Sequence, residues 1–248
     1  MSGESTKVQQ GPHPPRNCNA MATRIEDLTV RLFDVVTFDC YGTLIDWEAG
    51  ISEAFQDAAA ADGIRLDRTA VLRAIFDTRP AAEAPEYRSY RDILTDAAVR
   101  VGERFGWAIS RERAAFLPDS LPRWKPFPDT NAALERLITA GYALGILSNV
   151  DDDLLAGTRR HLSVSFSVLV TAQQVRSYKP APGHFTTARE RIGARSWHAA
   201  QSHFHDVVPA VGHGIPVAWI NRKGEQPTSV VRPDREFRTL AELTDWLA

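Results

Sequence analysis

A single aspartate ends an apolar run and leads into a tight turn in "TFDCYGTLID", residues 37–46. The run is typical of a buried strand, so Asp39 stands where that strand stops. A carboxylate that is oriented and partly desolvated is a competent covalent nucleophile. Gly42 supplies the turn and allows close backbone approach, and Thr43 would hydrogen-bond an anionic substrate or an ester. We therefore predict that Asp39 and Thr43 are catalytic, although Asp39 taken alone would equally suit a turn residue.

Polar side chains also follow later apolar runs. Ser148 and Asn149 come directly after "ALGIL". Their short donors, together with amide groups at the start of the next helix, would bind an anion. A helix-capping role is equally open to Asn149. Lys179, in "SYKPAP", would keep Asp39 ionised and stabilise developing negative charge. We expect these groups to converge with a second acid, Asp206.

Alternating strand and helix patterns explain why these residues would meet. Strands are predicted at 32–39, 143–149, 166–172, 198–202 and 216–221, and helices at 131–142, 151–162, 181–193, 207–214 and 239–248. The short connections between them predict an α/β fold, a Rossmann-like parallel sheet with helices on both faces. Ligands of such sheets bind beyond the carboxyl ends of the strands, where the polar residues stand.

A helical insert interrupts the alternation directly after the first strand. From residue 47 to about residue 116, apolar positions recur three and four apart, with Gly or Pro at the breaks and no convincing strand. We therefore predict a core domain of residues 26–46 and 122–248, and an α-helical cap domain at 47–121. Residues 1–25 are rich in Gly, Pro, Gln and Asn, and we expect a disordered tail there.

The composition argues against several classes of partner. The apolar fraction is 44%, the charged fraction 24% and the formal net charge −2, so no global field would draw the chain to nucleic acid or to an anionic membrane. No apolar run approaches the roughly 18 residues of a spanning helix. Cys18 and Cys40 give neither a disulfide framework nor a metal-ligand spacing. We expect a cytoplasmic protein that acts on a small molecule.

Four motifs in this order, "DCYGTL", "LSN", "YKPAP" and "HD", with a helical insert after the first, resemble the haloacid dehalogenase superfamily. The resemblance covers roughly residues 32–222. It implies that Asp39 attacks its substrate to form a covalent ester intermediate. It also implies that Asp206 either binds magnesium or positions Lys179 and the hydrolytic water. Homologues that resemble this chain are often dimers, so a homodimer is compatible with the resemblance.

Tyr41 stands where phosphatases of this superfamily carry a second aspartate, their general acid/base. A phenol with an ordinary pKa of about 10 is a poor proton shuttle at neutral pH, whereas an aliphatic halide leaves without a proton. The pattern "D-x-Y-G-T-L" resembles the L-2-haloacid dehalogenase branch, which needs no metal. We therefore expect hydrolysis at carbon of a small 2-haloacid or similar 2-substituted carboxylate, contacted by Tyr41, with no cofactor. The alternative is a phosphatase whose Mg²⁺ is bound by Asp39 and Asp206.

The match to the dehalogenases is incomplete near the last motif. Gln201 and His203 replace a serine and an asparagine, and Phe185 replaces a tyrosine. "TFDCYGTLIDWE" and "SHFHDVVPA" look closer to a side branch that includes a hydrolase opening azetidine-2-carboxylate, in which the leaving amine needs a proton. On a strand, His203 and His205 would share a face. We predict a catalytic role for His205 and a substrate-binding role for His203, for which a structural role is equally open.

The halide-binding arginine of the dehalogenases lies in their cap. Arg79, Arg88 and Arg91 are the candidates in this chain, and Arg88 is our choice because of the aromatic spacing in "PEYRSYRDIL". Trp47 and Phe127 would supply an apolar wall or part of the core.

The acidic run at 151–153 follows Asn149 directly. Three adjacent carboxylates cannot share one face of a helix, and acids in a first helical turn suit the helix dipole. We therefore expect these aspartates to act at the start of their own helix rather than as a functional cluster.

Overall fold

The central feature of the fold is one six-stranded parallel sheet. The computed structural model describes Met1, residues 33–78 and residues 86–248, and the predicted tail, apart from Met1, lies outside these residues. Leu32–Ala248 form one compact unit. The strands are β1 (Val35–Phe38), β2 (Ala143–Ser148), β3 (Val168–Thr171), β4 (Ser196–Ala200), β5 (Val217–Ile220) and β6 (Arg235–Phe237), in the order β3-β2-β1-β4-β5-β6.

Strand β1 lies near the middle of the sheet, paired on both sides. Val36 is in register with Leu144 of β2 and with Trp197 of β4. All four residues of β1 are buried, as expected for a strand with neighbours on both sides and covered faces. The residue that follows this strand is Asp39, so the most central strand of the sheet places the predicted nucleophile.

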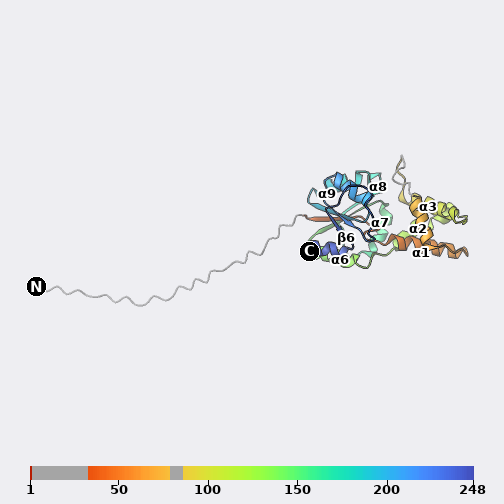
Figure 1. Ribbon diagram of the computed structural model, residues 1–248, viewed down its shortest axis with the longest axis horizontal. Helices are drawn as coiled ribbons and strands as arrows, with labels where there is room; N and C mark the ends of the chain where they lie inside the picture. The colour runs from red at the N-terminus through yellow and green to blue at the C-terminus, as the bar shows by residue number, and fades with distance from the viewer. Residues whose placement is uncertain (2–32, 79–85) are drawn as a thin grey trace. The chain divides into compact units, whose positions relative to one another are not determined.

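Helices cover both faces of the sheet (Figure 1), and their buried side chains form two apolar clusters with it. On one face, α6 (Thr130–Thr139) and α11 (Leu240–Leu247) bury leucines against Val36, Phe38 and Ile146. On the other face, α9 (Gly183–Ile192) and α10 (Val208–Gly212) pack on Leu147 and Val217. The remaining helices of this part are α7 (Asp152–Thr158), η2 (Arg159–His161), α8 (Ala172–Val175) and the π-helical turn η3 (His203–Val207). The predicted α/β sheet with helices on both faces is confirmed.

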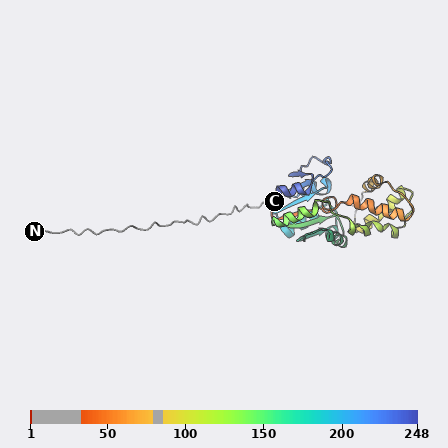
Figure 2. The ribbon, with the colours of Figure 1, turned by 90° about the horizontal axis from the view of Figure 1, so that it is seen from below.

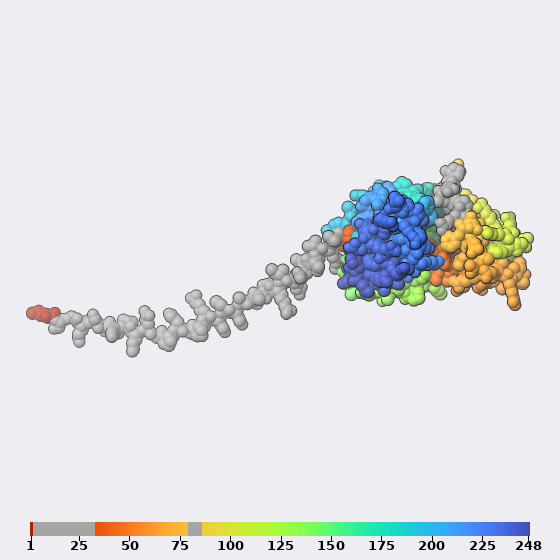
Figure 3. All heavy atoms as spheres, viewed as in Figure 1, coloured from red at the N-terminus to blue at the C-terminus, as the bar shows by residue number. Residues whose placement is uncertain are grey.

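The segment between β1 and β2 is helical. It contains α1 (Trp47–Ala61), α2 (Arg68–Asp77), α3 (Tyr90–Arg104), α4 (Arg111–Ala114), α5 (Phe116–Ser120) and η1 (Leu121–Arg123). Side chains of Asp46, Asp67 and Ser89 cap the first three helices, which accounts for where each begins. We call these elements the helical insert; helices α1–α3 lie together in both ribbon views and as one region of the surface (Figures 2 and 3). Its assignment to a separate cap domain stays a prediction.

The sequence patterns were wrong at two places in the sheet. Strand β6 was not predicted, because its three residues are mostly exposed and carry no apolar run. Strand β4 ends at Ala200, so "SHFHD" is not part of a strand: a π-helical turn, η3 (His203–Val207), begins there instead. His203 and His205 therefore do not share the face of a strand. Within the described part of the chain, no helix is long and apolar enough to cross a membrane.

Helix α1 approaches the segment after η1 so closely that Gly50 lies against the indole of Trp124. A methyl group at Gly50 would overlap that ring. The ring cannot easily move aside, because its Nε1 donates a hydrogen bond to Ser120 Oγ at 2.9 Å and its face meets Tyr41 edge-on. Gly50 therefore sets the spacing between α1 and the cavity wall that Trp124 forms.

We predict that Gly50→Ala lowers the free energy of unfolding by about 1–3 kcal/mol, since overpacking a closed site costs that much. Urea unfolding at neutral pH measures the change. Gly212→Ala is the matched control, because no heavy atom lies within 4 Å of its added methyl group; it should be neutral or slightly stabilising. Equal effects of the two changes would contradict the close approach.

Candidate active site

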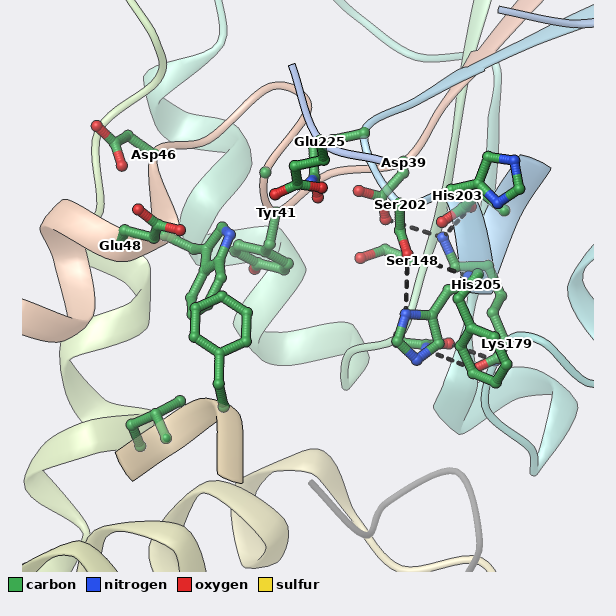
Figure 4. A pocket seen from close by; sticks show the side chains of 18 of the residues that line it. Asp39, Tyr41, Asp46, Glu48, Ser148, Lys179, Ser202, His203, His205 and Glu225 are labelled. Atoms are coloured by element: carbon green, nitrogen blue, oxygen red, sulfur yellow. Dashed lines mark hydrogen bonds and ion pairs between the residues drawn. The ribbon is translucent and has the colours of Figure 1, made fainter. Parts of the chain in front are cut away.

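Polar side chains from several strand ends gather at one cavity of about 570 Å³. Figure 4 shows Asp39, Ser148, Lys179, Ser202 and His205 on its sheet side. Of the residues predicted from the sequence, those lining it are Asp39, Tyr41, Ser148, Asn149, Lys179, His203, His205 and Asp206. The structure therefore brings together most of the predicted site.

The ammonium group of Lys179 lies between two carboxylates. Its Nζ donates to Asp39 Oδ1 at 2.8 Å, to Asp206 Oδ1 at 2.6 Å and to the carbonyl oxygen of Leu147 at 2.8 Å. Lys179 and Asp206 are each only 1% exposed, and Asp39 is 8% exposed. All three donors of the ammonium are thus used inside the protein, and one positive charge is shared by two negative charges.

Unequal sharing separates the pKa values of the two carboxyl groups. Burial works against ionisation of Asp206, but Lys179 and a hydrogen bond from His198 lower its pKa to about 2. Burial and the nearby charge of Asp206 raise the pKa of Asp39 above its ordinary value, despite the opposing effect of Lys179. The pKa of Lys179 is raised: burial lowers it, but both carboxylates more than compensate. The site therefore keeps one firmly ionised acid and one less stable, more reactive carboxylate.

The second oxygen of Asp39 is held by Thr43. Thr43 Oγ1 donates to Asp39 Oδ2 at 3.0 Å and accepts the backbone N–H of Gln201 at 2.9 Å. Thr43 is fully buried, so it orients the carboxylate rather than meeting the substrate. Gly42 has a φ of 103°, a backbone conformation that only glycine adopts without strain, and the turn it makes brings Thr43 back to Asp39.

Asn149 fixes the backbone at Lys179 instead of offering its amide to a ligand. Its Oδ1 accepts the N–H of Lys179 at 2.7 Å, and its Nδ2 donates to the carbonyl oxygen of Lys179 at 3.1 Å. Ser148 differs: its Oγ is buried and has no hydrogen-bond partner within the described part of the chain. Of this pair, Ser148 is thus the side chain placed to bind an anion.

His198 is a site residue that the sequence reading missed. It lies fully buried in β4, with its Nε2 3.0 Å from Asp206 Oδ1 and its Nδ1 2.9 Å from Thr37 Oγ1. The carboxylate of Asp206 is ionised and can only accept, so Nε2 of His198 is the donor in this contact. A histidine in the middle of an otherwise apolar strand, "WHAA", was the signal available in the sequence.

Tyr41 cannot replace the missing acid. Its hydroxyl group lies 2.9 Å from Thr158 Oγ1, and burial raises the pKa of the phenol well above 10. The ring also packs edge-on against Trp124, with centroids 5.9 Å apart. Tyr41 therefore serves as a wall of the cavity and does not exchange protons at neutral pH.

The two histidines of "SHFHD" have different surroundings. His203 is tied on both ring nitrogens, with Nδ1 2.9 Å from Thr228 Oγ1 and Nε2 3.1 Å from the carbonyl oxygen of Val231. It anchors the segment after β5, which favours the structural role over substrate binding. His205 Nδ1 lies 3.0 Å from Ser202 Oγ, and both residues line the cavity. The catalytic role of His205 stays a prediction, supported by its place in the cavity wall.

Arg88, the arginine chosen from the sequence, does not line this cavity, and neither does Arg91. Arg88 is paired with Asp96, its side chain is 45% exposed, and it lines a different pocket. Arg91 is paired with Asp119 and Asp153, and Arg79 lies outside the described residues. The choice of Arg88 was wrong because the spacing of aromatic residues does not reveal which acids pair with an arginine.

Two arginines that were not chosen line the cavity instead. Arg222 stacks over Phe127 at 4.0 Å, is paired with Asp129 and donates to the carbonyl oxygen of Thr43. Arg68, in the first turn of α2, has no hydrogen bond or ion pair among the described residues. Arg68 is therefore the cation of this cavity that remains available to an anion from the described part of the chain.

The acidic run at 151–153 does not act only on its own helix. The carboxylate of Asp151 accepts the N–H groups of Tyr90 and Arg91, at 3.0 and 2.9 Å, and so satisfies the start of α3 in the insert. Its side chain makes no capping bond to α7. Asp152 bonds Thr171 Oγ1 at 2.7 Å. The capping chemistry was expected, but the helix that Asp151 caps lies far away in the sequence.

The sequence of this chain is similar to those of known hydrolases. A family model of haloacid dehalogenase-like hydrolases matches residues 33–201. The chain belongs to this family of hydrolases. It is 27% identical to the (S)-2-haloacid dehalogenase of Pseudomonas putida over 217 residues, or 86% of this chain and 95% of that enzyme. It is 25% identical to haloacetate dehalogenase H-2 of Moraxella sp. (strain B) over 199 residues, or 79% and 88% of the two chains.

Solved structures agree on the fold of this hydrolase. The L-2-haloacid dehalogenase of Xanthobacter autotrophicus with chloropropionic acid covalently bound has a TM-score of 0.75 at 20% identity, over 87% of this chain and 98% of that chain. The resemblance drawn from the four sequence motifs is thereby confirmed.

A magnesium ion held between Asp39 and Asp206 does not fit the site of this hydrolase. The Oδ1 oxygens of the two carboxylates are both bonded to Lys179 Nζ, so the ammonium group already supplies the positive charge between them. Among the described residues, no group of three or more His, Cys, Asp or Glu side chains could hold a metal ion.

The shared ammonium group predicts opposite effects of two similar changes. Because the pKa of Asp39 is raised, its ionised form destabilises the folded hydrolase at pH 7. Asp39→Asn should therefore stabilise it by about 0.5–2 kcal/mol, as removal of a strained catalytic charge often does. Asp206→Asn should cost about 3–5 kcal/mol, because it breaks a buried pair. Urea unfolding compares them, and a loss of stability in Asp39→Asn as large as in Asp206→Asn would refute the unequal sharing.

Proposed function

We propose that the protein is a hydrolase that displaces a halide from C2 of a 2-halocarboxylate, with Asp39 as its nucleophile. The observation that carries this proposal is the fixed, nearly buried carboxylate of Asp39 at the cavity wall, held by Lys179 and Thr43. Tyr41, with its raised pKa, offers no proton to a leaving alkoxide, and a halide needs none. Relatives named as an (S)-2-haloacid dehalogenase and a haloacetate dehalogenase support the same kind of reaction.

The proposed reaction has two steps. An oxygen of Asp39 attacks C2 on the side opposite the halogen; a C–O bond forms while the carbon–halogen bond breaks, and the halide leaves with the electron pair. Water then attacks Cγ of the resulting Asp39 ester, which releases the 2-hydroxy acid and a proton and restores the carboxylate. Lys179 stabilises the negative charge that develops on the ester oxygen. The positive charge that stabilises this oxygen is therefore the ammonium group of Lys179.

The substrate carboxylate needs donors that are not already used. The unpartnered Oγ of Ser148 and the guanidinium of Arg68 both line the cavity and meet this requirement. We assign anion binding to these two groups, with Ser148 near the nucleophile and Arg68 on the insert. His205 and Ser202 stand beside them and are placed to accept the proton of the hydrolytic water.

The direct test measures halide release from (S)-2-chloropropionate by the purified protein, with and without EDTA. We expect release that EDTA does not change and that Asp39→Asn abolishes. A single turnover in H₂¹⁸O, with enzyme in excess, should place ¹⁸O in the carboxylate of Asp39 before it appears in product. Label in the product alone on the first turnover would rule out the ester. Release of phosphate from p-nitrophenyl phosphate, abolished by EDTA, would favour a phosphatase instead.

The pair formed by Ser202 and His205 favours one second candidate, the hydrolytic opening of a strained C–N ring such as that of azetidine-2-carboxylate. There the leaving amine must gain a proton, and His205 is the cavity residue suited to supply it. The same purified protein separates the candidates. Ring opening that is lost in His205→Gln, without halide release from any haloacid, would favour this candidate.

The acid limb of the pH–rate profile should follow Asp39. The attacking carboxylate must be ionised, and its pKa is raised above the ordinary 3.8, so kcat/KM should fall as the pH drops through an apparent pKa above 3.8. The lowered pKa of Asp206, about 2, means that its stabilising ionised form persists over this range. Circular dichroism at each pH checks that the fold survives. A limb at or below 3.8 would contradict the environment assigned to Asp39.

A further inference from the structure

The cavity has two chemically different ends. Its sheet side carries the polar groups described above. Its opposite wall comes from α1, α2, α3 and the segment after η1, and its large apolar members are Trp47, Ile75, Phe76, Ile93, Leu94 and Trp124. In Figure 4, Asp39 and Ser148 lie on one side of Tyr41, and Asp46 and Glu48 at the start of α1 lie on the other. A ligand that reaches from one end to the other must be polar at one end and apolar at the other.

The cavity as a whole is larger than a three-carbon haloacid requires. The cavity volume of about 570 Å³ falls within the range of roughly 300–1,000 Å³ found for pockets that hold drug-sized ligands. A substrate as small as 2-chloropropionate, with its carboxylate at Ser148, would leave the wall of the insert in contact with water. Apolar surface of this kind gains free energy when a ligand covers it.

Two aromatic rings at this end keep part of their surface toward the cavity. Trp47 and Phe76 pack edge-to-face, with centroids 5.1 Å apart and planes at 73°, and both side chains are only half-buried. Ile75, next to Phe76 on α2, is half-buried as well. An aromatic or alkyl group of a ligand would pack against the surfaces of these side chains that line the cavity.

Apart from Arg68, which is assigned above to the substrate carboxylate, the charged residues near this end have partners among the described residues. Lys223 is paired with Glu48, and Glu225 accepts a hydrogen bond from Gln201 Nε2 at 2.9 Å. Arg222 is paired as described above. Because these groups already have partners, a ligand needs no charged group at this end of the cavity.

We propose that the preferred substrate is a 2-halocarboxylate whose C2 carries a large apolar group, a benzyl group or an extended alkyl chain. This group lies against Trp47, Ile75 and Phe76, while C2 faces Asp39. The inference rests on the proposed function and names the substrate class of the same site.

A substrate series tests the inference through kcat/KM for halide release. The series runs from (S)-2-chloropropionate through 2-chlorobutanoate and 2-chlorohexanoate to 2-chloro-3-phenylpropionate. We expect kcat/KM to rise about threefold for each added methylene and at least tenfold from 2-chloropropionate to the phenyl compound. Values that stay level or fall along the series, with 2-chloropropionate turned over, would overturn the inference and leave the proposed function intact.

A variant that narrows the apolar end gives a second test. Ile75→Trp should lower the ratio of kcat/KM for the phenyl compound to that for 2-chloropropionate at least tenfold. Ile138→Trp is the matched control, because Ile138 lies on α6, is 43% exposed and does not line the cavity; its ratio should equal that of the unchanged protein. An unchanged ratio in Ile75→Trp would place the apolar group elsewhere and overturn the assignment.

Binding without chemistry separates the two proposals. Trp47 and Trp124 line the cavity, so tryptophan fluorescence reports its occupation. We expect 3-phenylpropionate, which has no leaving group, to bind at least tenfold more tightly than propionate. If no haloacid released halide, the proposed function would be wrong, and this comparison would still decide whether the site prefers a carboxylate with a large apolar group. Equal affinity for the two acids would overturn that preference.

Discussion

The buried ammonium group of Lys179 is the interaction on which the site depends. It bonds the carboxylate after β1, a carbonyl oxygen of β2 and the carboxylate in the turn after β4. Removing such charges from water costs several kcal/mol each, and the cost is offset only when the partners are well placed. The two hydrogen bonds between Asn149 and the backbone of Lys179, and the contact of His198 with Asp206, supply that placement. The strand ends are therefore held in the geometry that the chemistry requires.

The position of Lys179 between Asp39 and Asp206 also gives the two carboxylates different properties. Asp206 receives the shorter bond from Lys179 and a further one from His198, so it remains ionised and structural. Asp39 receives the longer bond and lies against the cavity, where burial makes its charge less stable. A nucleophile gains reactivity from the same destabilisation. In the proposed reaction, the unequal geometry of this ion triad makes Asp206 the supporting carboxylate and Asp39 the attacking one.

The fold and the sheet side of the site could be predicted because they depend on local patterns. Buried β-branched runs identify the strands, and residues that end parallel strands necessarily meet at one edge, so Asp39, Ser148, Lys179 and Asp206 could be placed together. Strand β6 could not be predicted, because it is exposed and is defined only by pairing with β5. The arginines failed for a related reason. The role of each arginine depends on which acidic residues of other helices lie near it, and the spacing of residues along the chain does not reveal these tertiary contacts.

Asp151 gives the helical insert and the loop after β2 a common anchor. The loop that presents Ser148 to the cavity continues within three residues to a carboxylate that receives two backbone N–H groups of α3. The insert and the sheet edge are therefore not interchangeable modules joined only at their two covalent connections. A chimaera that exchanges the insert for that of a relative must keep a helix that begins next to Asp151. Without it, the buried carboxylate of Asp151 would lose the two N–H donors that it has here. Recombination within the family is constrained by one carboxylate that belongs to neither the insert nor the catalytic set.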